Sequence, residues 1–200
     1  MLIIENQYFP PISSIKILSG NSHIGFPLYD KFRKMSFQNR CIIPTANGIT
    51  TLSIPLSGGR ENNQLFRDVR IDNTQLWQTR HWRTITSAYN RSPFFEYYEP
   101  GLEELFRTRF EFLHHWNKAI QVWLVKQLGI DLELKDIDIP GQEITKLVLP
   151  RNYQDPDITK DLPVYRQVFT DRHGFIPNMS SLDLLCCVGN NSASLLELML

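Results

Sequence analysis

The chain is poor in cysteine, and the three cysteines that it has do not suggest a cross-linked fold. They are Cys41, Cys186 and Cys187 in a chain of 200 residues. An odd number with an adjacent pair argues against a disulfide framework, which favours a reducing, cytoplasmic environment. No Cys-x-x-Cys pair or spaced Cys/His set indicates a structural zinc, so no metal is expected. We expect all three thiols to be buried and unreactive.

An excess of charge of either sign is also missing. The 21 basic residues balance 21 acidic ones, and the formal net charge is +0. Nucleic-acid binding driven by overall charge is therefore not expected, although a local basic pocket is compatible with this balance. The first residues lack the basic and apolar regions of a signal peptide, and every apolar run is shorter than the ~20 residues of a membrane span. We expect no membrane insertion.

Short motifs that identify common enzyme classes are absent. The chain has no GxxxxGKS/T phosphate loop, no GxGxxG dinucleotide turn, no GxSxG nucleophile elbow and no HExxH metal pair. Its hydrophobic content of 42% and aromatic content of 12% are those of a folded globule. We expect a single domain that spans residues 1–200 and whose activity, if any, does not depend on these motifs.

Short apolar runs alternate with amphipathic stretches along the chain. This pattern predicts an α/β or α+β fold, with a mixed sheet flanked by helices. Strands are expected at 2–5, 37–43, 50–54, 67–72 and 165–169, with two more within 132–149. Helices are expected at 11–18, 74–90 and 102–128, from Ser92-Pro93, and after Ser180. Polar residues at 57–63 predict a flexible loop.

The predicted helix at 74–90 carries polar residues where a core-filling helix would carry leucine or isoleucine. Trp77, His81, Thr84 and Ala88 fall on one face of it. The neighbouring positions are basic or hydroxylated: Arg80, Arg83, Ser87 and Arg91. The helix is therefore a candidate wall of a binding site, although His81 beside a tryptophan also fits a hydrogen-bonded core histidine.

A series of short motifs occurs in an order that resembles the WbqC-like family over nearly the whole chain. The motifs are Gln7-Tyr8-Phe9-Pro10, Gln38-Asn39-Arg40, Asn47-Gly48, Leu52-Ser-Ile-Pro55, Val69-Arg70-Ile71-Asp72, Trp77…His81, Ala88-Tyr89, Pro93-Phe94-Phe95, Gly174-Phe-Ile-Pro177 and Ser181-Leu-Asp183-Leu-Leu. Many relatives carry an extra proline after the first glutamine, where this chain continues directly with Tyr8. The resemblance implies a bacterial cytoplasmic protein of cell-surface polysaccharide biosynthesis, including the O-antigen of lipopolysaccharide, without a settled reaction.

Arg40 is the leading candidate for holding an anion. Its guanidinium fork suits bidentate binding of phosphate or carboxylate, and in a strand Asn39 points to the opposite face. The alternative is an ion pair with one of three carboxylates, Asp30, Asp68 or Asp183. Gln7 and Tyr8 follow the first predicted strand, at the strand end where ligand sites of α/β proteins gather.

His81 is the candidate general base, because an ordinary histidine pKa near 6.5 suits proton transfer at neutral pH. Asp183 lies among leucines, so its carboxylate needs a partner. It either orients His81 or Arg40 or caps a helix. Cys41 is conceivable as a nucleophile with His81 as its base, but a buried inert thiol is the simpler interpretation.

From the resemblance and these residues we expect an enzyme that transfers an acyl or aminoacyl group to a nucleotide-linked amino sugar, with the donor free or on a carrier protein. His81 and Asp183 are the expected catalytic residues, and Gln7 and Asn39 would donate hydrogen bonds to the oxyanion. The expected substrate-binding residues are Gln7, Tyr8, Asn39, Arg40, Trp77, Thr84 and Tyr89. This site requires Gln7, Arg40, His81 and Asp183 to converge in space.

The alternative is a non-catalytic binding module. It would recruit or stabilise a glycan-biosynthesis enzyme or a carrier protein. The contact patch would consist of four aromatic residues that we expect to be exposed: Phe94, Phe95, Tyr97 and Tyr98.

Overall fold

The computed structural model describes residues 1–58, 64–141, 143–145 and 147–197. Most of the loop predicted at 57–63 therefore lies outside the described residues. Helices, parallel strands and antiparallel strands are all present, which confirms the predicted α/β class with mixed strand pairing. The parallel and antiparallel strands belong to two separate sheets rather than to one continuous sheet.

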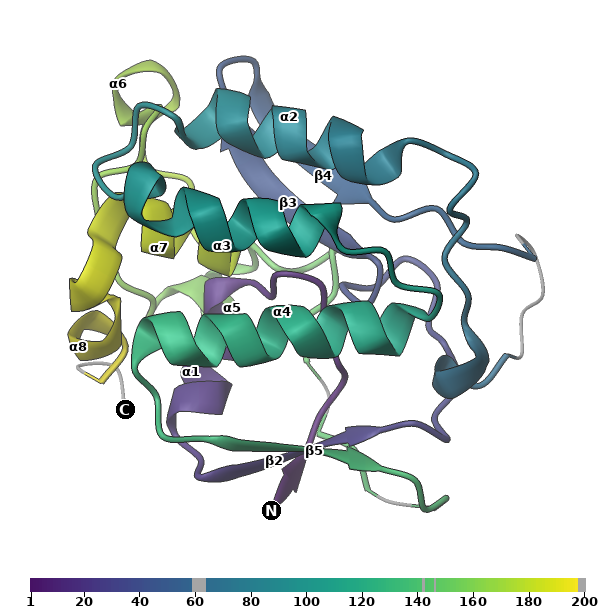
Figure 1. Cartoon of the computed structure of the whole chain (residues 1–200). Helices are drawn as coiled ribbons and strands as arrows, with labels where there is room; N and C mark the ends of the chain where they lie inside the picture. Colours follow the sequence, from purple (N-terminus) through teal and green to yellow (C-terminus); the bar gives the residue numbers. More distant parts are fainter. Residues whose placement is uncertain (59–63, 142, 146, 198–200) are drawn as a thin grey trace.

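The parallel sheet lies at one end of the molecule (Figure 1) and contains β1 (Leu2–Ile3), β2 (His23–Pro27) and β5 (Glu133–Ile137) in the order β1-β2-β5. Helix α1 (Ile12–Ser19) connects β1 to β2. It starts directly after Pro11, whose φ of −66° is already that of a helix and whose missing N–H costs no hydrogen bond there.

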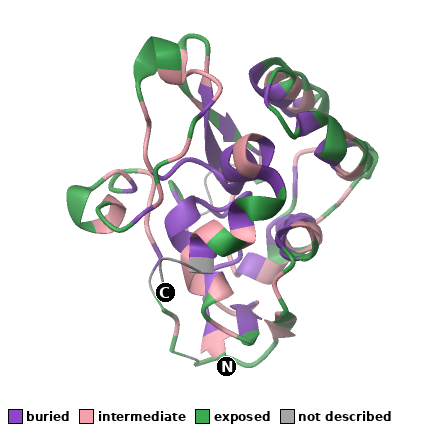
Figure 2. Ribbon diagram, turned by 90° about the vertical axis from the view of Figure 1, so that its left-hand side faces the viewer, coloured by how far each residue is buried: buried purple, intermediate pink, exposed green. Residues whose placement is uncertain are grey.

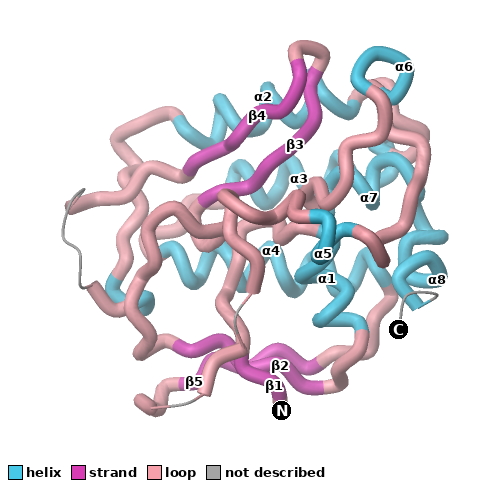
Figure 3. The backbone as a smooth tube through the Cα atoms, turned by 180° about the vertical axis from the view of Figure 1, so that it is seen from behind, coloured by secondary structure: helices cyan, strands magenta, loops and turns pink. Residues whose placement is uncertain are grey.

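The antiparallel sheet is a hairpin of β3 (Arg40–Thr45) and β4 (Gly48–Ser53) at the opposite end of the molecule (Figure 3). Only Ala46 and Asn47 lie between the two strands, so the connection is a two-residue turn that leads directly into Gly48. Gly48 has a φ of +108°, a conformation that favours glycine. The hairpin tip is therefore short and defined by its sequence.

Three helices, α2 (Trp77–Tyr89), α3 (Phe95–Arg107) and α4 (Leu113–Leu128), lie one beneath another on one side of the molecule (Figure 1). Loops dominate the opposite side (Figure 3). The single helix predicted at 102–128 is wrong, because the chain leaves the helical conformation at Thr108. Near this break, Phe112 pairs with Arg70 in an isolated β-bridge. The backbone between α3 and α4 therefore pairs with a distant segment instead of continuing the helix.

Two predicted strands are also wrong. The segment predicted as a strand at 67–72 contains the 3-10 helix η1 (Phe66–Asp68), followed by isolated bridges at Arg70 and Ile71. Residues 165–169 are irregular up to a turn before the next helix. Of the two strands predicted within 132–149, one is β5 and the other is reduced to an isolated bridge between Thr145 and Ile4.

The C-terminal part consists of short helices: α5 (Pro156–Thr159), α6 (Thr170–His173), α7 (Ser181–Val188), the 3-10 helix η2 (Gly189–Asn191) and α8 (Ser192–Glu197). Helix α7 packs against α1, α3, α4 and β3. The side chain of Ser180 accepts a hydrogen bond from the backbone N–H of Leu182 and caps α7, as the sequence predicts.

One contiguous apolar core joins both sheets and the helices between them. It includes Ile24 of β2, Leu52 of β4 and Leu102 of α3. Buried segments concentrate in the middle of the molecule and exposed ones at its periphery (Figure 2). No helix in the described part of the chain is long and apolar enough to cross a membrane.

Candidate functional site

The polar face of α2 divides into a buried end and an open end. At the buried end, Trp77 and His81 are 3% and 6% exposed. At the open end, Thr84 and Ala88 line a cavity together with residues from two other segments. The second half of this helix therefore forms a wall of a cavity, while its first half is part of the core.

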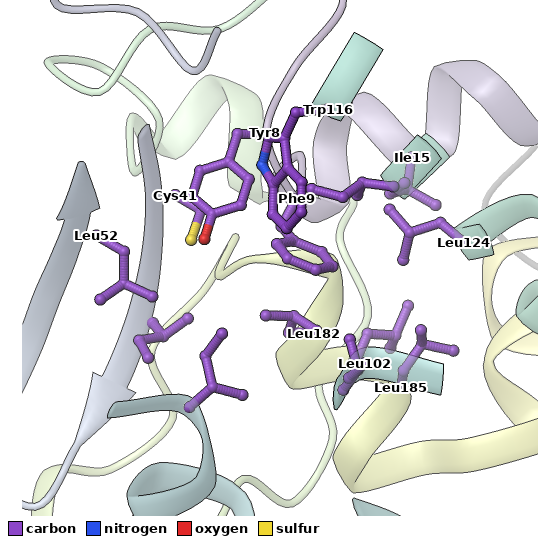
Figure 4. Close-up of a cluster of buried hydrophobic side chains, with 14 of the residues drawn as sticks. Tyr8, Phe9, Ile15, Cys41, Leu52, Leu102, Trp116, Leu124, Leu182 and Leu185 are labelled. Carbon is purple, nitrogen blue, oxygen red and sulfur yellow. The ribbon is translucent and has the colours of Figure 1, made fainter. Parts of the chain in front are cut away.

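His81 is enclosed by aromatic residues. The hydroxyl oxygen of Tyr8 lies 2.9 Å from Nδ1 of His81, and the indole of Trp77 meets the imidazole edge-on at 5.3 Å between ring centroids. On its other side, Tyr8 lies beside the thiol of Cys41 (Figure 4), which is itself fully buried. The residues Tyr8, Trp77 and His81, all predicted to belong to the site, thus lie together.

Burial lowers the pKa of His81 to about 4, although a hydrogen bond with the Ser53 backbone partly opposes this effect. A hydrogen bond raises the pKa of an imidazole when the ring is the donor, so the ring donates to the backbone of Ser53. Nδ1 is then the acceptor in the hydrogen bond with the Tyr8 hydroxyl. The ring is neutral at pH 7, and both hydrogen bonds serve to hold α2 to β4 and to the loop after β1.

The cavity at the open end of α2 has a volume of about 600 Å³. A second cavity of about 560 Å³ shares Ala46, Arg91, Val168 and Phe169 with it, so the two adjoin, and we describe them together as one cleft. Its walls are the hairpin tip, the second half of α2 and the segment 166–172. We call it the arginine cleft after four of its lining residues: Arg83, Arg91, Arg166 and Arg172.

The four arginines face little negative charge in the cleft. Asp171 lines it and pairs with Arg166 at 3.2 Å between Nη2 and Oδ2. Arg172 donates a hydrogen bond to the carbonyl oxygen of Ala46 at 2.8 Å, and the imidazole of His173 donates to the same oxygen at 3.1 Å. Arg83 and Arg91 form no ion pair with any residue that the structure describes.

Asp183 lies directly behind the lining of the arginine cleft. Its Oδ2 accepts hydrogen bonds from the Tyr165 hydroxyl at 2.6 Å and from Nε2 of Gln167 at 2.8 Å. Its Oδ1 lies 4.0 Å from Sγ of Cys187. Burial raises the pKa of Asp183 to about 6, and hydrogen bonds from Tyr165, Gln167 and Tyr89 oppose that rise.

The structure thus brings Asp183 and Tyr89 together, but not Asp183 and His81. The expected contacts of Asp183 with His81 or Arg40 are wrong, because its hydrogen bonds go to Tyr165 and Gln167. Nor does Asp183 cap the helix, since Ser180 performs that role. The two buried polar groups lie at opposite ends of α2.

Arg40 and Asn39 line a different cavity, with a volume of about 280 Å³. Side chains alternate along β3, so Arg40 points away from the face on which Cys41 meets Tyr8. None of the three carboxylates considered for it pairs with Arg40 in the described structure, and its buried Nε lacks a hydrogen-bond partner there. The side-chain amide of Asn39 donates to the carbonyl of Ile54 at 3.1 Å.

Gln7 is 1% exposed, and neither atom of its side-chain amide has a well-formed hydrogen bond among the described residues. Its side chain faces the carboxylate of Glu5, whose pKa burial raises and whose hydrogen bond with Gln7 partly opposes that rise. The backbone carbonyl of Gln7 accepts a hydrogen bond from Gln121 of α4. The predicted convergence of Gln7, Arg40, His81 and Asp183 at one open site is therefore wrong.

The predicted aromatic patch is only half exposed. Phe94 and Tyr97 are 36% and 66% exposed, but Phe95 and Tyr98 are buried between α2, α3 and α4. The i, i+3 spacing of Phe95 and Tyr98 places them on one side of α3, and that side faces the core. A continuous four-residue patch does not exist on this surface.

Sequence reasoning missed the second wall of the cleft, which Arg166, Gln167, Arg172 and Cys187 provide. Part of this wall, residues 165–169, was expected to be a strand but is irregular, and Arg172 lies in the short helix α6. Cys187 was expected to be buried, whereas it is only half-buried and lines the cleft. The burial expected for Cys41 and Cys186 is confirmed.

Fold and cleft together describe an α/β protein with a basic cleft, in whose lining four arginines lie with one aspartate. A family model described as the WbqC-like protein family matches residues 7–149, and the chain belongs to this family. The match includes the hairpin and α2, but it ends before the segment that supplies the second wall. No curated protein and no solved structure matches the chain.

Proposed function

We propose that this chain acts in the cytoplasm in the assembly of a bacterial surface polysaccharide, such as the O-antigen of lipopolysaccharide. It binds a nucleotide-linked amino sugar in the arginine cleft and transfers an acyl or aminoacyl group to the amine of that sugar. Membership in the WbqC-like family supports the setting. The proposed binding of a nucleotide sugar rests on the arginine cleft, whose lining contains four arginines and one aspartate.

The cleft has the chemistry to bind a diphosphate. One guanidinium group can bind two phosphate oxygens at once. Arg83 and Arg91 are exposed and form no ion pair with any described residue. Thr84, Ser87 and Asn90 add hydroxyl and amide groups along the same wall. The hydroxyl of Thr84 already donates to the carbonyl of Arg80, so it keeps its lone pairs as acceptors for sugar hydroxyls.

Asp183 is the group best placed to receive a proton during transfer. It lies behind Gln167 and Cys187, both of which line the cleft. Its raised pKa of about 6 makes it a stronger base than an ordinary aspartate while it stays ionised at neutral pH. His81 is poorly suited to this step, because its ring is buried and engaged by Tyr8 and Ser53 and its lowered pKa of about 4 makes it a weak base.

The binding part is tested by calorimetric titration with a panel of nucleoside-diphosphate amino sugars. We expect wild-type protein to bind at least one of them, and the double substitution Arg83→Ala, Arg91→Ala to weaken that binding at least about 100-fold, since each charge-assisted contact contributes about 1.5–3 kcal/mol. Arg80→Ala is the matched control, because Arg80 is exposed on the same helix outside the cleft lining.

Arg40→Ala separates the two basic cavities. If this substitution abolishes binding while the Arg83→Ala, Arg91→Ala variant binds normally, the ligand occupies the smaller cavity, and our assignment to the arginine cleft is wrong. If folded wild-type protein binds no member of the panel but does bind an acyl carrier protein or a glycosyltransferase, the non-catalytic module replaces the transferase.

A further inference from the structure

The cavity that Arg40 lines lies at the base of the hairpin, whereas the hairpin tip lines the arginine cleft. This base cavity has a volume of about 280 Å³, and its lining comes from the loop after β2, the start of β3 and the chain after β4. Its described lining shares no residue with the arginine cleft. From Arg40 to Ala46 at the tip, the strand spans roughly 20 Å, so the two cavities are separate sites.

Arg40 brings a positive charge to the base cavity that no described carboxylate meets. It forms no ion pair with the residues that the structure describes, and its buried Nε has no hydrogen-bond partner among them. Lys34 also lines the cavity, whereas no aspartate or glutamate of the described chain does. A guanidinium fork binds the two oxygens of a carboxylate in parallel. Arg40 is therefore placed to hold the anionic group of a ligand.

Most of the other side chains that line the base cavity are apolar: Phe32, Met35, Ile54 and Leu56. Met35 is 62% exposed, so the cavity has an apolar side chain in contact with solvent at its opening. A ligand with a hydrocarbon part would cover this surface and remove it from water. A hydrated inorganic ion would leave it uncovered, so the lining indicates an anion that carries a hydrocarbon body.

Hydrogen bonds hold the walls of the base cavity in place. The backbone N–H of Ile54 donates to the carbonyl oxygen of Asn39 at 2.9 Å, and the side-chain amide of Asn39 donates back to the carbonyl oxygen of Ile54 at 3.1 Å. In the loop after β2, the side-chain oxygen of buried Gln38 accepts from the backbone N–H of Arg33 at 2.8 Å. A ligand therefore meets a largely preformed site and orders little of the chain when it binds.

We infer that the base cavity binds a small organic acid, with its carboxylate on Arg40 and its hydrocarbon body against the apolar lining. A carboxylate suits the site because its single charge and two coplanar oxygens match one guanidinium fork. The inference goes beyond the proposed function, since it gives the protein a second ligand at a second site. It does not depend on nucleotide-sugar binding, because the two sites share no described lining residue.

The first test is calorimetric titration of the wild-type protein with straight-chain carboxylates from acetate to octanoate. We expect saturable binding whose affinity rises about fourfold for each added methylene group until the cavity is filled. Hexanol should bind at least about tenfold more weakly than hexanoate, because it lacks the charge-assisted contact. Hexylamine should not bind, and hexyl phosphate should bind no more tightly than hexanoate.

The second test removes the charge. Arg40→Met keeps an unbranched side chain but cannot bind a carboxylate, so the affinity for hexanoate should fall at least about tenfold. Circular dichroism and thermal unfolding establish that the variant is folded. The matched control is the double substitution Arg83→Ala, Arg91→Ala, which changes only the arginine cleft and should bind hexanoate like wild type.

The third test locates the ligand in the wild-type protein and needs no variant in the binding site. The methionine methyl groups are labelled with ¹³C, and the signal of Met35 is identified by its loss in Met35→Leu. Hexanoate should shift the methyl signal of Met35, which lines the base cavity. The signal of Met179 should stay in place, because Met179 is fully buried in a different cluster of side chains.

Four results would each overturn the inference: no saturable carboxylate binding, equal or tighter binding of hexylamine or hexyl phosphate, unchanged affinity in folded Arg40→Met, or bound hexanoate that leaves Met35 unshifted. Loss of hexanoate binding in the Arg83→Ala, Arg91→Ala variant would place the acid in the arginine cleft and overturn it as well. If hexanoate binds as expected while no nucleotide sugar binds, the base cavity stands and only the proposed function is wrong.

Discussion

The hydroxyl of Tyr8 and Nδ1 of His81 are 2.9 Å apart in the core, although the two residues are 73 positions apart in the chain. Tyr8 belongs to the loop after β1, and His81 belongs to α2. The same imidazole is hydrogen-bonded to the backbone of Ser53 at the end of β4. One side chain therefore connects the N-terminal loop, the hairpin and the helix that supplies a wall of the arginine cleft.

Tyr8→Phe tests the strength of this connection. The substitution keeps the ring and leaves Nδ1 of His81 as a buried acceptor without a partner. We expect the free energy of unfolding, measured with urea, to fall by about 1–3 kcal/mol. Tyr97→Phe is the control, because Tyr97 is 66% exposed, and its effect should stay within about 0.5 kcal/mol. Equal effects of the two changes would contradict a structural role for the hydrogen bond.

The lowered pKa of His81 predicts an acid sensitivity. An unfolded histidine takes up its proton near pH 6.5, whereas the folded one does so only near pH 4. The stability that comes from keeping the ring neutral is therefore present above pH 6.5 and is lost as the pH falls to about 4. We expect wild type to lose about 3 kcal/mol relative to His81→Gln over this window. Parallel pH profiles of unfolding would show that His81 titrates normally.

Asp183 predicts the opposite dependence. Its pKa is about 6 in the folded protein against 3.8 for an ordinary aspartate, so folding favours the protonated carboxyl group. That contribution to stability is fully present below pH 3.8 and is lost as the pH rises through 6. Between pH 4 and pH 7, wild type should lose about 2 kcal/mol relative to Asp183→Asn. A difference that does not change with pH would place Asp183 in a more polar environment than the structure shows.

Gly189 and Gly48 offer a matched pair for backbone and packing effects. Both have positive φ, +65° and +108°, so alanine is strained at either position. A Cβ on Gly48 meets nothing within 4 Å, whereas a Cβ on Gly189 collides with the ring of Phe94. Thermal or urea unfolding should show Gly189→Ala to be less stable than Gly48→Ala by about 1–3 kcal/mol. Similar losses would mean that Phe94 is free to move away.

Much of α2 was predictable, because its signal is local. The residues from Trp77 to Tyr89 alternate with a period close to 3.6, and that period sets which side chains share a face without reference to the rest of the chain. Local spacing also places Thr84, Ser87 and Arg91 near one another. It does not say which half of the helix is covered, since this depends on Tyr8 and β4, which are distant in sequence.

The second wall of the cleft could not be predicted for the same reason. Arg166 and Arg172 lie more than 70 residues after α2, in a segment without a regular period, and they reach the cleft from irregular backbone and from the short helix α6, respectively. The break between α3 and α4 is similar. Residues 108–112 contain neither proline nor glycine, and the chain is extended there because Arg70 and Phe112 pair across the structure.

The carbonyl of Ala46 accepts hydrogen bonds from both Arg172 and His173, across 126 and 127 residues of sequence. This contact fastens the tip of an early hairpin to one of the last helices. During synthesis the ribosome releases the hairpin and α2 long before α6, so one wall of the cleft exists without the other until nearly the whole chain has emerged. Ligand binding would then distinguish complete from truncated polypeptides, and a chain ending before residue 166 should keep the family's matched segment without the cleft.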